Sequence, residues 1–258
     1  MEITRQIDRS ISHVGPKYKA KKFIAYFLNF TNTYMPLSRF RYCVEEACGH
    51  PDIVGLAVST RPDCIHESYL EVLREAQGKY GTNITVELGL QSVNPHTLLK
   101  IGRCHTVAEF IDAALQIGRY HFDLCTHIIA DLPWDDRIDL EEAAKLVSVL
   151  PVTEIKIHSL YIIKGTKLAK MYEKGDIKLL PPEEYAERVV LILSMLRPDI
   201  VVQRIVGRAS ANTLSVNGGR PWWEVKEYIE KLMRNRHIQQ GSACNYLHGA
   251  AVRRFLHE

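Results

Sequence analysis

Several features that would place this 258-residue chain in a special class of proteins are missing from it. No apolar run is long enough to span a bilayer, and the N-terminal stretch MEITRQIDRSISHV lacks the apolar core of a signal peptide. A cytoplasmic location and no membrane partner are therefore expected. The six cysteines are scattered along the chain, which is typical of reduced thiols rather than of a disulfide framework.

Signatures of common metal and phosphate sites are also missing. The eleven histidines and six cysteines show neither a His-x-x-x-His nor a Cys-x-x-Cys spacing, and no Gly-x-x-x-x-Gly-Lys-Ser/Thr loop occurs. We therefore predict no metal ligands in this chain. A net charge of +3 is too small to demand a nucleic-acid partner. The basic residues near the C-terminus favour a solvated face over an RNA contact; they are Arg234, Arg236, Arg253 and Arg254.

What the sequence does contain is a regular alternation of strand-like and helix-like segments. Strands are expected over 22–30, 53–60, 84–90, 122–131, 154–163 and 199–207. Helices are expected over 3–14, after Pro36, over 68–81, 98–101, 108–120 and 140–150, around Pro181-Pro182, and over 222–235. This order predicts parallel strands joined by right-handed crossovers, in an open doubly wound sheet or in a full or partial β/α barrel.

No linker or low-complexity tract interrupts the chain, and its hydrophobic content of 46% suffices for a substantial core. A single domain over 1–258 is expected. Residues 1–200 would form its core, and residues 201–258 would add a C-terminal strand and helix.

Polar side chains gather where the expected strands end. In the strand over 84–90, Glu87, Gly89 and Gln91 occupy one face, because strand side chains alternate. An unpaired charge buried in an apolar centre costs several kcal/mol, so these groups must face one another, water or a ligand. Similar polar groups lie at 31–34, 59–63, 127–131, 156–158 and Arg204. Because carboxyl ends of parallel strands gather binding groups, a polar pocket at one barrel mouth is predicted.

Structural roles compete with this hypothesis. Glu87 and Gln91 would equally suit a hydrogen-bonded pair within a barrel. His127 with Asp131 suits either a catalytic base with its orienting carboxylate or a satisfied core histidine. His158 and Lys156 carry the same two readings.

The strings TNTY, STRPD, ELGLQS, LLKIGRCH, IIADLP and EIKIHSLYIIKGTKLAKMYEKG resemble, in order and spacing, the radical S-adenosylmethionine (radical SAM) superfamily. The similarity is greatest to a bacterial branch related to elongator-type and coproporphyrinogen-dehydrogenase-type enzymes, and it covers nearly the whole chain. It implies a partial (β/α)6 barrel in which a [4Fe-4S] cluster reduces S-adenosylmethionine, so that a 5′-deoxyadenosyl radical takes hydrogen from a substrate.

Carried over by position, the resemblance implies a set of cofactor-binding residues. The strand end at Thr31, Asn32 and Thr33 would meet the methionine amino group. The ribose and methionine portion falls to Glu87, Gln91 and Ser92. Residues bordering the same cavity or flanking the adenine are Ser59, Thr60, Arg61, Asp63, His127, Asp131 and His158.

The chain departs from the family in two places. The cluster-binding Cys-x3-Cys-x2-Cys triplet is absent, and the chain begins with the helix that normally follows that loop. We therefore expect a truncated or cluster-less form that lacks the first barrel strand, leaves a sheet edge open and is inactive as given. Asp131-Leu-Pro-Trp134 stands where relatives carry Gly-Leu-Pro-Gly, so the adenine-side turn is expected to be altered.

The sequence identifies neither the substrate nor the catalytic residues. An external electron donor would be the partner of a full-length enzyme. Two other functions fit the same residues: a non-catalytic barrel that binds a nucleoside-like ligand or a protein partner, and a metal-independent enzyme that uses Asp131, His127 and Lys156.

Overall fold

The computed structural model describes residues 2–208 and 212–255, in which strands and helices alternate as the sequence predicted. Six strands form one sheet in the order β1-β2-β3-β4-β5-β7: Phe23–Phe27 (β1), Ile53–Thr60 (β2), Asn83–Gln91 (β3), Asp123–Ile129 (β4), Glu154–His158 (β5) and Val201–Arg204 (β7). The β1–β2, β2–β3 and β5–β7 pairs are parallel. The predicted α/β class is therefore confirmed.

Nine α-helices connect these strands in the described part of the chain. They are Ile3–Tyr18 (α1), Leu37–Cys48 (α2), Glu67–Tyr80 (α3), Pro95–Lys100 (α4), Val107–Arg119 (α5), Arg137–Val149 (α6), Lys167–Glu173 (α7), Pro182–Met195 (α8) and Trp222–Asn235 (α9). Two short strands, Ile162–Ile163 (β6) and Thr213–Ser215 (β8), form a separate antiparallel pair. Within residues 2–208 and 212–255, no helix has both the length and the apolar character needed to cross a membrane.

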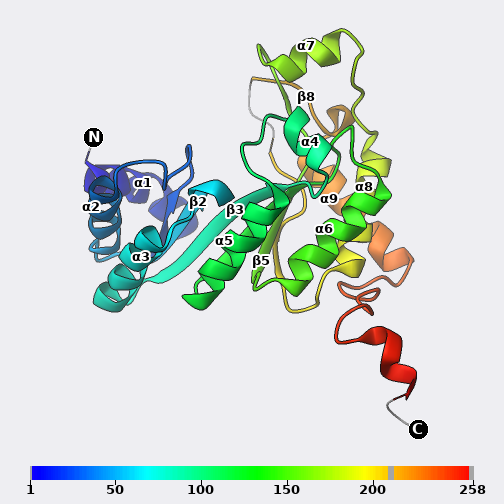
Figure 1. Cartoon of the computed structure of the whole chain (residues 1–258). Helices are drawn as coiled ribbons and strands as arrows, with labels where there is room; N and C mark the ends of the chain where they lie inside the picture. The colour runs from blue at the N-terminus through cyan, green and yellow to red at the C-terminus, as the bar shows by residue number, and fades with distance from the viewer. Residues whose placement is uncertain (1, 209–211, 256–258) are drawn as a thin grey trace. The chain divides into compact units, whose positions relative to one another are not determined.

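The first of two compact units comprises Met1–Gly89 and His105–Thr126. In it, α2 and α3 lie side by side (Figure 1), and Phe40 of α2 meets the ring of Tyr69 of α3 edge-on at 5.2 Å. Phe40 is fully buried, as are Leu56 and Val58 of β2. Burial of each such side chain contributes about 1.5–3 kcal/mol, which fixes the face of the strands that the helices cover. The opposite face of β1–β3 is left for polar groups.

The second compact unit comprises Leu90–Cys104 and His127–Glu258. Helices α6 and α8 lie side by side in it (Figure 1). Asp136 caps the N-terminus of α6 by accepting from the backbone N–H groups of Ile138 and Asp139 at 2.7 and 3.1 Å. A cap of this kind is worth about 1 kcal/mol, so the loop after β4 ends at a defined residue.

Several predicted boundaries were wrong; the expected strand over 199–207, for example, is observed only over Val201–Arg204. The expected strand over 154–163 divides into β5 and β6, because the backbone N–H of Leu160 donates to the Asp131 carboxylate at 2.6 Å instead of to a neighbouring strand. The expected strand over 22–30 ends at Phe27, and the chain then turns through Phe30, whose φ is +65°. Helix α1 continues past Pro16 to Tyr18, because a proline in the last turn removes only one backbone donor.

Two glycines of α3 provide a matched test of local conformation. Gly81 follows the helix with a φ of +67°, whereas Gly78 lies inside the helix with nothing within 4 Å of an added Cβ atom. We expect Gly81→Ala to lower the free energy of unfolding by about 1 kcal/mol, since alanine disfavours the left-handed region, and Gly78→Ala to raise it by about 1 kcal/mol. Urea unfolding of both variants checks this; changes of the same sign would contradict the assigned helix end.

Candidate functional site

The polar face of β1–β3 carries small side chains beside a buried carboxylate. In the sheet register Tyr26 is paired with Ala57, and Ser59 is paired with Glu87. Gly55 lies two residues before Ala57 on the same face, because strand side chains alternate. The Ile24 side chain lies 3.1 Å from the position of a Cβ atom at Gly55 and occupies that part of the face, so the small side chains nearest to Glu87 are those of Ala57 and Ser59.

Glu87 is the centre of this face. Its carboxylate is only 3% exposed, and its Oε2 accepts hydrogen bonds from the Tyr26 hydroxyl at 2.5 Å and from the Ser59 hydroxyl at 3.1 Å. The two hydroxyls are 3.4 Å apart. Side chains of three neighbouring strands therefore hold the Glu87 carboxyl group in place. Glu87 and Ser59, two of the residues expected at the site, are therefore in direct contact.

The ends of β1 and β2 are fastened to each other by two more predicted residues. The Asn32 side-chain amide donates to the carbonyl oxygens of Phe27 at 2.7 Å and Ser59 at 2.8 Å. The hydroxyls of Thr33 and Thr60, both buried, are 2.5 Å apart. The predicted residue Thr31 is half-buried in the turn between them. Asn32, Thr33 and Thr60 therefore have structural partners and set the shape of the site's rim.

Arg61 and Asp63 form an ion pair just after β2. The guanidinium donates to both carboxylate oxygens, at 2.9 and 2.5 Å, and lies 6.0 Å from the centre of the Tyr34 ring. Burial opposes ionisation of Asp63, but the hydrogen bond and positive charge of Arg61 outweigh it and lower the pKa of Asp63. The pair therefore stays charged at neutral pH and borders the site as a rigid polar group.

In the second unit, the ends of β4 and β5 bring His127 and His158 together, with ring centres 5.1 Å apart. Asp131 lies beyond the end of β4, 4% exposed, and it holds the backbone N–H of Leu160. Burial raises the pKa of Asp131 to about 7. The sequence suggested that the Asp131 carboxylate orients a catalytic base. In the structure this carboxylate positions the backbone after β5.

Gln91 is the last residue of β3 and Ser92 follows it, and the two residues have different environments. Gln91 has a φ of +67°, and strained backbone of this kind in a non-glycine residue gathers at functional sites. Ser92 is buried, and its hydroxyl accepts from the backbone N–H of Asn94 at 2.9 Å, next to the start of α4. Gln91 thus remains a candidate ligand, whereas Ser92 shapes the loop.

The turn that follows Asp131 carries Trp134 where the resemblance leads one to expect a glycine. Trp134 is absent from the residues with positive φ, and it packs against a buried cluster that includes Leu132, Leu160 and Ile162. The Lys100 ammonium lies 5.3 Å from its ring centre. Trp134 therefore anchors this loop by packing.

Two residues that the sequence analysis missed contact predicted site residues or the backbone beside them. They are Tyr26, which donates to Glu87, and Arg188. Arg188 donates to the carbonyl oxygens of Ala130 at 3.2 Å and Asp135 at 3.0 Å, which fixes the loop after β4. The signal for Tyr26 was present, because alternation along 22–30 places it on one face with Leu28. No sequence pattern marks Arg188, which lies on α8, far along the chain.

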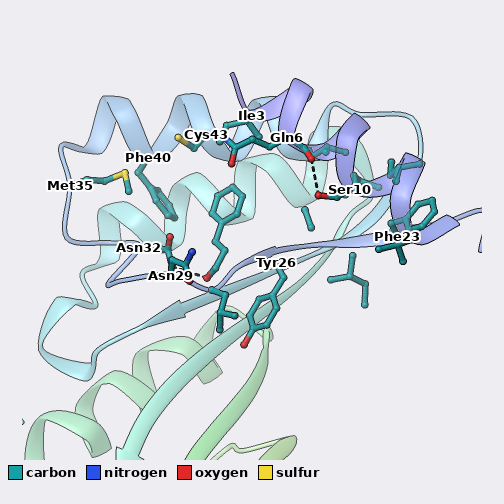
Figure 2. Close-up of a pocket in the computed structure, with 18 of the residues that line it drawn as sticks. Ile3, Gln6, Ser10, Phe23, Tyr26, Asn29, Asn32, Met35, Phe40 and Cys43 are labelled. Atoms are coloured by element: carbon teal, nitrogen blue, oxygen red, sulfur yellow. Dashed lines mark hydrogen bonds between the residues drawn. The ribbon is translucent and has the colours of Figure 1, made fainter. Parts of the chain in front are cut away.

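A cavity of about 690 Å³ lies between α1, β1 and α2 (Figure 2). The cavity is largely apolar, and its lining includes Ile3, Phe23, Met35 and Phe40. The Tyr26 ring points away from α2, the helix that bears Phe40 (Figure 2). β1 is the first strand in the order of the sheet, so one of its edges pairs with no described strand. This is the open sheet edge that the sequence predicted. This cavity is distinct in chemistry from the predicted polar pocket.

The cysteines do not fit a [4Fe-4S] cluster, which requires three neighbouring thiolates from the protein. No three cysteine sulfurs lie together in the described part of the chain. Cys43 and Cys48 are buried on α2, and burial raises the pKa of Cys48 to about 11. After anaerobic reconstitution we expect far fewer than about four irons per chain, measured by iron assay and by visible absorbance. Stoichiometric cluster would contradict this account.

Comparisons with known proteins identify the relatives of this chain. Residues 152–235 match the family described as Radical_SAM C-terminal domain. The protein YtqA of Bacillus subtilis (strain 168) is 37% identical over 229 residues, covering 87% of this chain and 70% of YtqA. The chain belongs to the radical SAM superfamily. The radical SAM chain is also 31% identical over 235 residues to YhcC of Escherichia coli (strain K12), covering 87% of this chain and 72% of YhcC.

A solved structure confirms the partial barrel of the radical SAM type. Archaeal Elp3 of Methanocaldococcus infernus, lacking its N-terminal residues, aligns with a TM-score of 0.71 at 19% identity over 92% of this chain. The radical SAM chain spans 59% of the length of that structure. At this identity the likeness concerns the fold alone.

Proposed function

We propose that this chain is the S-adenosylmethionine-binding domain of a radical SAM protein, with the polar face of β1–β3 as part of its binding site. The observation that carries the proposal is the Glu87 carboxylate, which is buried beside small side chains and held by the hydroxyls of Tyr26 and Ser59. Membership of the superfamily favours this ligand over an unrelated nucleoside or a protein partner.

The chemistry of these groups suits S-adenosylmethionine. A carboxylate accepts hydrogen bonds from the two ribose hydroxyls and attracts the positive sulfonium centre. The hydroxyls of Ser59 and Tyr26 keep the carboxylate oriented, so little ordering is left for the moment of binding. In the family, a [4Fe-4S] cluster supplies the electron that cleaves S-adenosylmethionine. No step of that reaction is assigned to this chain, because its thiols do not fit the cluster.

The other predicted residues enter the proposal as expectations from the resemblance. Gln91 would add an amide to the ribose and methionine portion. The ends of β4 and β5, with His127, Asp131 and His158, would flank the adenine. In this assignment Asp131 acts as a positioning residue, because its carboxylate holds the Leu160 backbone N–H rather than the ligand.

Calorimetric titration with S-adenosylmethionine tests the proposal, and two tyrosines offer a matched comparison. Tyr26 and Tyr42 are both 41% exposed, but only Tyr26 donates to Glu87. We expect Tyr26→Phe to weaken binding about ten-fold, since a hydrogen bond to a charged group is worth about 1.5–3 kcal/mol, and Tyr42→Phe to leave it unchanged. Equal effects of both variants, or no binding to the unmodified chain, would overturn the proposal.

A further inference from the structure

A groove on the second unit is lined by residues of β7, β8 and α9, and Arg204 is its one member among the polar groups expected at strand ends. Two cavities of about 570 and 550 Å³ share Arg208 and Trp222 in their lining. Their cationic lining residues are Arg204, Arg208, Arg220 and Lys226, against a single carboxylate, that of Glu230. The groove is therefore strongly biased toward a negatively charged ligand.

Two of these cations have no carboxylate partner. Lys226 pairs with Glu230, and Arg220 pairs with Glu183 at 2.6 Å. No ion pair in the described part of the chain includes Arg204 or Arg208. An anionic ligand would therefore pair with these two arginines without displacing a carboxylate of the described chain.

Aromatic rings lie between these charges. The Arg208 guanidinium lies 4.8 Å from the centre of the Trp222 ring, and Trp223 meets Trp222 edge-on at 6.1 Å. Trp223 is 56% exposed, although it stands at the start of a helix whose apolar side is buried at Val225 and Ile229. A large aromatic ring left in solvent beside unpaired arginines is a surface on which planar groups stack.

We propose that this Arg–Trp groove, formed by Arg204, Arg208, Trp222, Trp223 and Lys226, binds single-stranded nucleic acid. Phosphates would pair with the arginines and Lys226, while an unstacked base would lie on the exposed Trp223 ring. An acidic peptide would use the cations but has no planar groups for the tryptophans, so the rings favour nucleic acid. The basic residue Arg236, suspected from the sequence, instead pairs with both oxygens of Glu187 at 2.6 Å. The side chains of Arg253 and Arg254 lie outside the described part of the chain.

Fluorescence anisotropy with labelled oligouridylate and oligothymidylate of roughly ten nucleotides tests the groove and separates RNA from DNA. We expect saturable binding that weakens with salt. Trp223→Ala should weaken it about ten-fold, and Lys226→Glu should weaken it and reduce the salt dependence by about one counterion. Lys231→Glu on the same helix changes the same charge outside the groove and should have a much smaller effect.

Every result of this anisotropy experiment either supports or overturns the proposed nucleic-acid groove. Binding of either oligonucleotide that is sensitive to Trp223 and Lys226 supports the groove, and preference for oligouridylate identifies RNA. Absence of binding at low salt, an effect of Lys231→Glu as large as that of Lys226→Glu, or equally tight displacement by polyglutamate overturns the proposal. Because the tested surface excludes Tyr26, Ser59 and Glu87, failure here leaves the S-adenosylmethionine proposal untouched, and the reverse also holds.

Discussion

Substituting Glu87 by glutamine is expected to weaken S-adenosylmethionine binding by one to two orders of magnitude. The amide keeps the shape of the side chain but loses the negative charge that Tyr26 and Ser59 now hold in place. A hydrogen bond to a charged group is worth about 1.5–3 kcal/mol, and one tenfold step in affinity is 1.4 kcal/mol. Calorimetric titration of the unmodified chain and the variant measures the ratio of dissociation constants directly.

Glu75→Gln is the control for this change, because it removes a carboxylate that pairs with Arg41 on the helical side of the same unit. It should leave the affinity unchanged. Thermal unfolding of both variants separates lost binding from lost folding. Equal affinity of Glu87→Gln and the unmodified chain would remove Glu87 from the site.

Asp131→Asn changes how stability depends on pH, and this is the second large effect that we expect. Burial raises the pKa of Asp131 to about 7, against 3.8 for an ordinary aspartate. Between these values the folded chain holds a proton that the unfolded chain releases. The unfolded state therefore binds fewer protons, and the contribution of Asp131 to stability is full below about pH 4 and is lost as the pH rises toward 7.

Asparagine is neutral throughout this range, and its side-chain oxygen still accepts from the Leu160 backbone N–H. The variant should therefore match the unmodified chain near pH 4 and exceed its free energy of unfolding by roughly 4 kcal/mol at pH 8. Urea unfolding at several pH values measures the difference. The control Asp131→Ala leaves the Leu160 N–H without its partner and should be destabilised by about 1–3 kcal/mol even at low pH. A constant gap between Asp131→Asn and the unmodified chain would contradict the raised pKa.

The parts of this structure that follow local rules were predictable from the sequence. Alternation placed Glu87 on the polar face of its strand, and the structure holds it there by hydrogen bonds from Tyr26 and Ser59. The helix over 222–235 was found with its observed limits, because its apolar side repeats with helical spacing and Pro221 precedes it. The end of α3 was expected near Gly78 or Gly81, and the structure places it at Gly81, whose left-handed conformation favours glycine.

The remainder depends on contacts between distant segments. Asp131 reads as the end of a strand, but it terminates the β5 ladder by taking the Leu160 N–H from 29 residues away. Asn32 reads as a ligand because it follows a strand, yet its amide is occupied by the carbonyls of Phe27 and Ser59. Polar residues at strand ends serve ligand binding and loop closure with the same chemistry, so only coordinates distinguish the two roles.

The central claim, that the polar face of β1–β3 holds S-adenosylmethionine, is tested most directly by hydrogen–deuterium exchange of the unmodified chain with and without the ligand. We predict slower exchange in peptides that contain Tyr26, Ser59 and Glu87, and no change in those of α2 and α3. Unchanged exchange in all three strands at a saturating concentration, or protection confined to the helices, would contradict the account.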